Sequence, residues 1–277
     1  MAFASQAAGP RFGAEVYTWF MKESGRAHAN QLDHVIQVVA KAGFSGIEPM
    51  HFWMGDLGDP SRLAGSLQSQ EIELAGISLV LDWNHAGETG DERREADRTM
   101  DLLARFPGAV LGLVQMPTSR DDLVTRRLRL VDNVNAVARR AAERGIAASF
   151  HPNSPHTSIA RTAEDYEVLL NGLDPRVVGW MPDVGHIANG GMDPLATMQR
   201  YAELINHVHY KDWDGAPEFC LMGKGKVDFT GITRWLCGRG YTGWIICEDE
   251  GAEAVDDPDG VTRLDGEWVR TQLLPAL

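Results

Sequence analysis

The chain has 277 residues, of which 44% are hydrophobic and 23% charged, which is the composition of an ordinary globular protein. This length is close to the roughly 250 residues of one eight-stranded α/β barrel, so it does not require two domains. Nucleic-acid binding requires a surface rich in lysine and arginine, whereas this chain has a formal net charge of −13 at pH 7. We therefore expect no nucleic-acid partner.

The expected compartment follows from the cysteines and from the hydropathy pattern. The three cysteines form no Cys-x-x-Cys pair, which indicates free thiols in a reducing environment. No window reaches the roughly 18 uninterrupted apolar residues of a membrane span, and the first ten residues lack the pattern of a signal peptide. We therefore expect a cytoplasmic protein without membrane contact.

Eight short apolar segments predict β-strands, near residues 11–18, 45–48, 74–81, 109–115, 146–151, 177–182, 206–210 and 243–248. Amphipathic helical patterns separate nearly all of these segments, and this alternation specifies a parallel sheet with helices outside it. Neither a GxGxxG nor a GxxxxGK[ST] motif is present to indicate a nucleotide fold. We therefore predict a single (β/α)8 barrel over residues 11–277, preceded by a disordered segment over residues 1–10.

Several helix boundaries can also be predicted from local signals. Gly43, Gly145 and Gly240 each follow a helical pattern, where a left-handed residue ends a helix. The pair Thr162 and Asp165 resembles a capping box, and Asp193 precedes a proline suited to the first helical position.

Four consecutive predicted strands end in residue types that bind metals. These are His151, Asp183, His209 and Glu248, and the carboxyl ends of barrel strands form the active-site rim in this fold class. Each residue alone has an ordinary explanation, such as a hydrogen-bonded histidine, a helix cap or a solvated acidic loop. Their shared register favours a metal site, and mixed imidazole and carboxylate ligands suit Mn²⁺, Zn²⁺, Fe²⁺ or Co²⁺ better than Ca²⁺.

Four sequence runs carry a resemblance to the xylose-isomerase-like barrel superfamily, namely residues 181–194 (MPDVGHIANGGMDP), 207–212 (HVHYKD), 223–229 (GKGKVDF) and 240–248 (GYTGWIICE). The resemblance covers essentially the whole chain and is densest after residue 146. The run FHPNSPH at 150–156 is most similar to inosose dehydratases within that group.

The resemblance implies one divalent metal, usually Mn²⁺, with Zn²⁺, Co²⁺, Fe²⁺ or Mg²⁺ as alternatives. Asp183, His209 and Glu248 match the family's ligands, and His186 matches a histidine that touches substrate oxygens in the epimerases. His151 stands where ketose epimerases carry a glutamate, so a mechanism with two opposed carboxylates is placed in doubt.

Further candidates lie near the same predicted rim. The candidate catalytic groups are His151, His186, Glu48 and Lys211, and the sequence leaves open whether His151 is a metal ligand or a base. A surface glutamate and an ion-paired lysine are the ordinary alternatives for Glu48 and Lys211. Aromatic faces stack on sugar or cyclitol rings, and together with a further histidine they give the candidate substrate-binding residues Trp53, Trp83, Trp213, His156 and His186. Packing in the barrel is the alternative for the tryptophans. His51, His85 and Gln115 are weaker candidates.

The function expected from these residues is chemistry on a keto-sugar or keto-cyclitol through a metal-stabilised enediolate. Dehydration by β-elimination, as in inosose dehydratases, is the first expectation. A sugar isomerase or epimerase, a β-eliminating enzyme that cleaves 3-keto-glycosides, C-glycosides included, and a metal-free sugar-binding barrel are the alternatives. The sequence leaves open whether the chain forms a homo-oligomer or needs a partner subunit.

Overall fold

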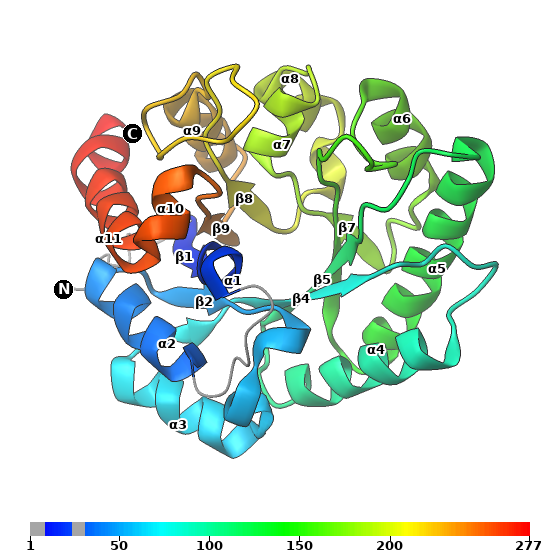
Figure 1. Ribbon diagram of the computed structural model, residues 1–277, viewed down its shortest axis with the longest axis horizontal. Helices are drawn as coiled ribbons and strands as arrows, with labels where there is room; N and C mark the ends of the chain where they lie inside the picture. The colour runs from blue at the N-terminus through cyan, green and yellow to red at the C-terminus, as the bar shows by residue number, and fades with distance from the viewer. Residues whose placement is uncertain (1–8, 24–30) are drawn as a thin grey trace. The chain divides into compact units, whose positions relative to one another are not determined.

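The computed structural model describes residues 9–23 and 31–277 (Figure 1). Most of the segment predicted to be disordered, residues 1–10, therefore lies outside the described residues. The chain divides into two compact units. Unit 1 contains residues 1–75 and 208–277, and unit 2 contains residues 76–207.

Unit 1 is built on a parallel sheet with the strand order β3-β2-β1-β9-β8. Its strands are β1 (Arg11–Glu15), β2 (Gly46–Glu48), β3 (Glu73–Leu74), β8 (Val208–Tyr210) and β9 (Trp244–Cys247). Its α-helices are α1 (Tyr17–Glu23), α2 (Gln31–Ala42), α3 (Pro60–Gln70), α9 (Phe229–Gly238), α10 (Ala252–Asp256) and α11 (Pro258–Trp268). Short helical turns are η1 (His51–Trp53), η2 (Gly55–Gly58), η4 (Val269–Leu273) and η5 (Leu274–Ala276). Helices from the first and last parts of the sequence pack together here, α11 on α2 and α10 on α1.

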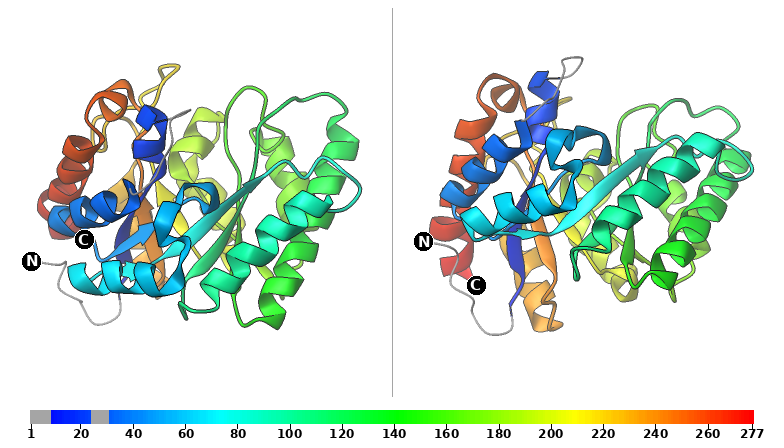
Figure 2. Two further views of the ribbon diagram at one scale, coloured as in Figure 1. Left: turned by 60° about the horizontal axis from the view of Figure 1, so that its bottom comes forward. Right: turned by 90° about the horizontal axis from the view of Figure 1, so that it is seen from below.

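Unit 2 is built on a parallel sheet with the strand order β4-β5-β6-β7. Its strands are β4 (Gly76–Leu81), β5 (Val110–Gln115), β6 (Ala147–His151) and β7 (Val178–Trp180). Its helices are α4 (Gly90–Leu103), α5 (Leu123–Glu143), α6 (Ala163–Gly172), α7 (Val184–Asn189), α8 (Pro194–Arg200) and the turn η3 (Ala202–Leu204). Both views of Figure 2 show α4 and α5 lying along the strands of this sheet, which they contact.

Each of the eight predicted strand segments contains an observed strand. The third segment differs in detail, because it is divided at Ala75 into β3 and β4, which pair in different sheets. Strands β4 and β5 are buried along nearly their whole length, as expected where helices cover the outer face of a parallel sheet.

The predicted helix boundaries are confirmed. Thr162 and Asp165 form a complete capping box at the start of α6, and Asp193 caps α8 ahead of its proline. Gly43, Gly145 and Gly240 adopt φ angles of 96°, 73° and 73°, which a residue without a Cβ takes at little cost.

Two further expectations can be compared with the described residues. The three cysteines are free, as predicted. Among helices in the described part of the chain, none combines the length and apolar character needed to cross a membrane.

A buried carboxylate, Asp165 of α6, ties together the loops of unit 2. It accepts hydrogen bonds from Arg120 (2.7 Å), from Arg127, and from the backbone N–H groups of Arg161 (3.0 Å) and Thr162 (2.8 Å). Burial acts to raise the pKa of Asp165, but the Arg120 guanidinium and these N–H groups outweigh it and hold that pKa below its usual range. This carboxylate therefore anchors the loop that follows β6 to the helices α5 and α6.

We expect Asp165→Asn to lower the free energy of unfolding by about 3–5 kcal/mol, because it leaves buried Arg127 without its main charge partner. The pKa of Asp165 is lowered on folding, so its stabilising contribution is complete at neutral pH. That contribution is lost as the pH falls below about 4 toward the folded-state pKa. Urea unfolding between about pH 7 and about pH 3 measures both effects.

The matched control is Glu164→Gln, since Glu164 also contacts Arg127 but is exposed to solvent. We expect it to cost less than about 1 kcal/mol. Equal losses for the two variants would contradict the anchoring role of Asp165.

Candidate active site

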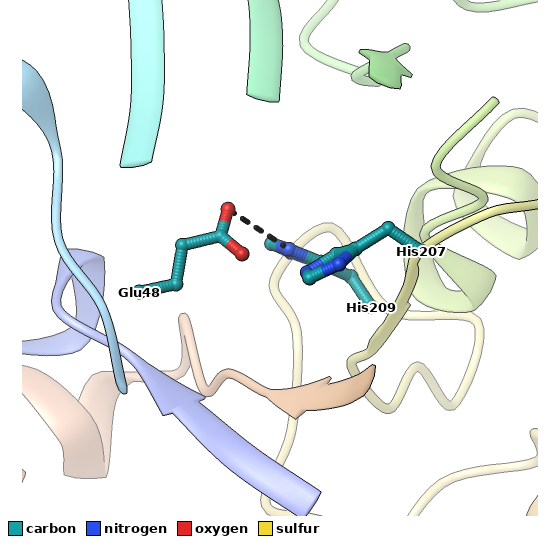
Figure 3. A group of neighbouring side chains, drawn as sticks. All are labelled: Glu48, His207 and His209. Atoms are coloured by element: carbon teal, nitrogen blue, oxygen red, sulfur yellow. Dashed lines mark ion pairs between the residues drawn. The ribbon is translucent and has the colours of Figure 1, made fainter. Parts of the chain in front are cut away.

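Three buried carboxylates surround the imidazole of His209 within unit 1. Glu15 ends β1, Glu48 ends β2, and Glu248 follows β9. His209 Nδ1 lies 3.2 Å from Glu15 Oε2 and 3.6 Å from Glu248 Oε2. His209 Nε2 lies 3.4 Å from Glu48 Oε1, and Figure 3 shows this carboxylate directed toward the ring. The predicted residues His209, Glu248 and Glu48 are therefore brought together.

Glu15 is a member of this cluster that sequence reasoning missed. Its side chain is only 6% exposed, and it pairs in register with Glu48 of the neighbouring strand. A signal was present, because β1 and β2 end in the similar tripeptides Gly-Ala-Glu15 and Gly-Ile-Glu48. Two strands that end in the same way at one rim warrant the same functional prediction.

The electrostatics of the cluster favour a cation. Burial acts to lower the pKa of His209, but Glu48 and Glu15 outweigh it and raise that pKa well above its usual value. Burial, with the nearby charge of Glu15, raises the pKa of Glu248, while Lys211 opposes this shift. Glu15, Glu48 and Glu248 place three buried carboxyl groups close together, with only His209 and Lys211 as positive partners, and a divalent cation would relieve the repulsion between the carboxylates. Glu15, His209 and Glu248 also each offer a ligand atom within 4.8 Å of the others.

Lys211 is fully buried beside this cluster. Its Nζ lies 3.1 Å from Glu248 Oε2, bonds to Glu250 Oε1, and sits 5.1 Å from the centroid of the Phe219 ring. Burial raises the pKa of Glu250 to about 7 even though Lys211 acts to lower it. The ion-paired alternative for Lys211 is therefore present in the structure, and its catalytic role remains a prediction.

Asp212 shapes the loop that follows β8. Its carboxylate accepts hydrogen bonds from the backbone N–H groups of Trp213 (2.8 Å), Gly223 (2.9 Å), Gly225 (2.8 Å) and Val227 (3.3 Å). The loop that carries the predicted substrate residue Trp213 is thus held together by hydrogen bonds to one buried side chain, that of Asp212. Trp213 is half-buried at this loop, and its indole N–H donates to the carbonyl of Ala216 (2.7 Å).

Unit 2 brings together three other predicted residues. His151 ends β6, and Asp183 caps α7 by accepting a hydrogen bond from the backbone N–H of His186 (2.8 Å). The second Asp183 oxygen, Oδ2, lies 3.7 Å from His151 Nε2 and 3.9 Å from His186 Nε2. The two imidazole rings meet edge to face, 5.8 Å apart. The four predicted metal ligands therefore form two buried pairs, His151–Asp183 in unit 2 and His209–Glu248 in unit 1.

The predicted substrate-binding residues differ in exposure. Trp53 and Trp83 are each 1% exposed, whereas His156 is exposed and its Nδ1 accepts a hydrogen bond from Arg161 (2.8 Å). Trp83 adopts φ 48°, an uncommon conformation for an aromatic residue, and its backbone N–H donates to Glu92 Oε1 (2.6 Å).

The three weaker candidates lie on different elements. Gln115 is buried at the end of β5 and donates to the carbonyl of Asp82 (3.2 Å). His51 is half-buried in η1, and His85 is exposed after β4.

Comparison with known proteins adds an independent finding. The family model described as "Xylose isomerase-like TIM barrel" matches residues 36–272 of the chain. The inosose dehydratase of Geobacillus kaustophilus is 30% identical over 273 aligned residues, which cover 86% of this chain and 86% of the relative.

Solved structures share the fold. A probable 3-DHS dehydratase from Bacillus anthracis superposes with a TM-score of 0.75 at 16% identity, covering 95% of this chain and 99% of that one. A D-psicose 3-epimerase from Clostridium cellulolyticum, solved with D-tagatose, gives a TM-score of 0.72 at 17% identity, covering 94% and 99%. The predicted fold class, an α/β chain with the (β/α)8 barrel fold, is confirmed. The chain belongs to the xylose isomerase-like TIM-barrel family.

Proposed function

We propose that the protein is a divalent-metal-dependent lyase that removes water from a keto-cyclitol or keto-sugar. One observation carries this proposal: buried imidazole–carboxylate pairs stand at strand ends in a chain that aligns with an inosose dehydratase over 86% of its length. A structural neighbour described as a probable dehydratase supports the same class of reaction.

We propose that His151, Asp183, His209 and Glu248 together hold one metal ion, most readily Mn²⁺, with Zn²⁺, Co²⁺, Fe²⁺ or Mg²⁺ as alternatives. The support is that all four follow or end strands of a barrel fold, whose active sites lie at the carboxyl ends of the strands. Two imidazoles and two carboxylates form a donor set that suits these ions. When bound, such an ion supplies Lewis-acid stabilisation of negative charge on a carbonyl oxygen.

The chain's own groups would move the protons. Dehydration breaks a C–H bond next to the ketone and a C–O bond at the β-carbon, forms a C=C bond, and releases water. Glu48 accepts the proton from carbon if His151 is a metal ligand, and His151 is the alternative base if it does not bind the metal. Lys211, held as an ammonium ion beside Glu248 and Glu250, donates a proton to the departing hydroxyl, and His186 contacts a substrate oxygen.

The test is incubation of the purified protein and Mn²⁺ with a panel of keto-inositols, ketoses and 3-keto-glycosides, followed by mass spectrometry of the products. A product lighter than its substrate by one water molecule supports the proposal. Conversion without a mass change would identify an isomerase or epimerase, and fragmentation would identify a glycoside-cleaving enzyme. Binding without any conversion, by a protein that also takes up no metal, would identify a sugar-binding barrel.

A further inference from the structure

A chain of hydrogen bonds within unit 2 holds the His186 ring from its Nδ1 side. Ser154, in the loop after β6, places its Oγ 2.8 Å from His186 Nδ1. Asn189, one helical turn after His186 in α7, donates from Nδ2 to the same Oγ over 2.9 Å. Ser154 is only 2% exposed, so this hydroxyl is shielded from solvent.

Only one assignment of donors and acceptors satisfies every group in this series of hydrogen bonds. A serine hydroxyl has one proton to donate and lone pairs to accept. Because Asn189 donates to Ser154 Oγ, the hydroxyl proton of Ser154 is directed to its other partner, His186 Nδ1. If Nδ1 carried a proton instead, Oγ would accept two hydrogen bonds, and its buried proton would find no other acceptor among residues 9–23 and 31–277.

The position of Asn189 is itself constrained. The backbone carbonyl of Asn189 accepts a hydrogen bond from Arg161 Nη2 over 3.3 Å. The next residue is Gly190, where a Cβ would lie 2.2 Å from the carbonyl oxygen of Arg161, so only glycine allows this close approach. The end of α7 is thereby packed against the loop that carries Ser154.

We propose that Ser154 and Asn189 are positioning residues that keep His186 in the neutral tautomer with its proton on Nε2. The ring then presents an N–H donor, rather than a lone pair, on the side that faces Asp183 Oδ2 at 3.9 Å. That this donor meets an oxygen of the keto substrate rests on the proposed function, whereas the tautomer itself does not. His186 thus acts as a hydrogen-bond donor to developing negative charge and not as the base that removes a proton from carbon.

The decisive measurement is a long-range ¹H–¹⁵N correlation spectrum of protein labelled with ¹⁵N-histidine. It is recorded on metal-free, substrate-free protein at a pH well above the imidazole pKa, and His186→Gln identifies the His186 signals. We expect the wild type to show the proton on Nε2, with a preference of roughly tenfold or more over Nδ1. Ser154→Ala should reduce this preference, since the Nδ1 lone pair loses its donor.

Asn189→Asp should invert the tautomer. A carboxylate in place of the amide accepts the Ser154 proton, so Ser154 Oγ then accepts from a protonated His186 Nδ1. Asn171→Asp is the matched control, because Asn171 is exposed on α6 of the same unit, and it should leave the His186 signals unchanged.

A wild-type spectrum with the proton on Nδ1 would overturn the inference, and so would an Asn189→Asp spectrum unchanged from wild type. If Asn189→Asp fails to fold, the wild-type and Ser154→Ala spectra still decide the question. If the proposed function is correct, kcat/KM for dehydration should fall by roughly 10²-fold in Asn189→Asp. If the spectra are as expected but no keto substrate is dehydrated, the tautomer assignment holds and only the proposed function is rejected.

Discussion

Glu248→Gln should weaken divalent-metal binding by more than about 100-fold. Mutating a residue that only hydrogen-bonds to a metal ligand already lowers metal affinity by roughly 10–100-fold, and the loss of a ligand should cost more. The substitution preserves the size of the side chain but removes a buried negative charge next to His209. It also removes a partner of buried Lys211, whose ammonium group then depends on Glu250. Turnover should fall with metal occupancy. Calorimetric titration of chelator-treated protein with Mn²⁺ measures the affinity, and dehydration of the best substrate measures the turnover.

Glu253→Gln is the control, since this residue also lies in the acidic segment after β9 but is exposed at the start of α10. It should bind Mn²⁺ as tightly as the wild type. Full activity of the wild type after exhaustive chelation would contradict the metal-dependent mechanism, and equal affinities of the two variants would remove Glu248 from the ligand set.

His151→Glu should keep a bound metal yet lose dehydration activity by roughly 10²–10⁴-fold, the range usual for removing a proton-transferring group. The variant replaces an imidazole at the end of β6, 3.7 Å from Asp183, with the glutamate that the family resemblance implies for ketose epimerases at this position. A carboxylate can still bind a metal, but it adds a negative charge and changes the proton affinity at this point. Elemental analysis of the purified variant gives the metal content, and the keto-substrate assay gives the rate.

His151→Ala separates the two roles of this residue. If His151 is a ligand, its loss should lower both metal affinity and turnover. If it is the base, the metal should remain and only turnover should fall. A His151→Glu variant that matches the wild type on the same substrate would show that the histidine does not distinguish a dehydratase from an epimerase, and the preference for dehydration would then lack its main support from this site.

Much of the fold could be predicted from the sequence because its signals are local. The period of the apolar residues and the capping residue Thr162 depend on neighbours a few positions away, and they placed strands and helix starts correctly. The division of the third strand at Ala75 is different in kind. It depends on which backbone groups on neighbouring strands are free to pair, and local periodicity carries no information about that.

The candidate site was predictable only in part. Residues at strand ends, such as His151, Asp183, His209 and Glu248, could be found because a parallel α/β fold places all strand ends alike. The contact of Glu15 with His209 could not be predicted in this way. It arises because β1 pairs with β9, a strand more than two hundred residues later, and so lies one strand from β8.

Local patterns were therefore enough to predict the fold class, most strand and helix positions, and the residue types at the strand ends. Folding brings Glu15 to 3.2 Å from His209, buries Lys211 between two carboxylates and joins Ser154 to His186, and none of these contacts could be predicted from local patterns. Secondary structure follows from interactions between near neighbours in the chain. The direction of a side chain, its burial and its hydrogen-bond partner follow from packing between segments that are distant in the sequence.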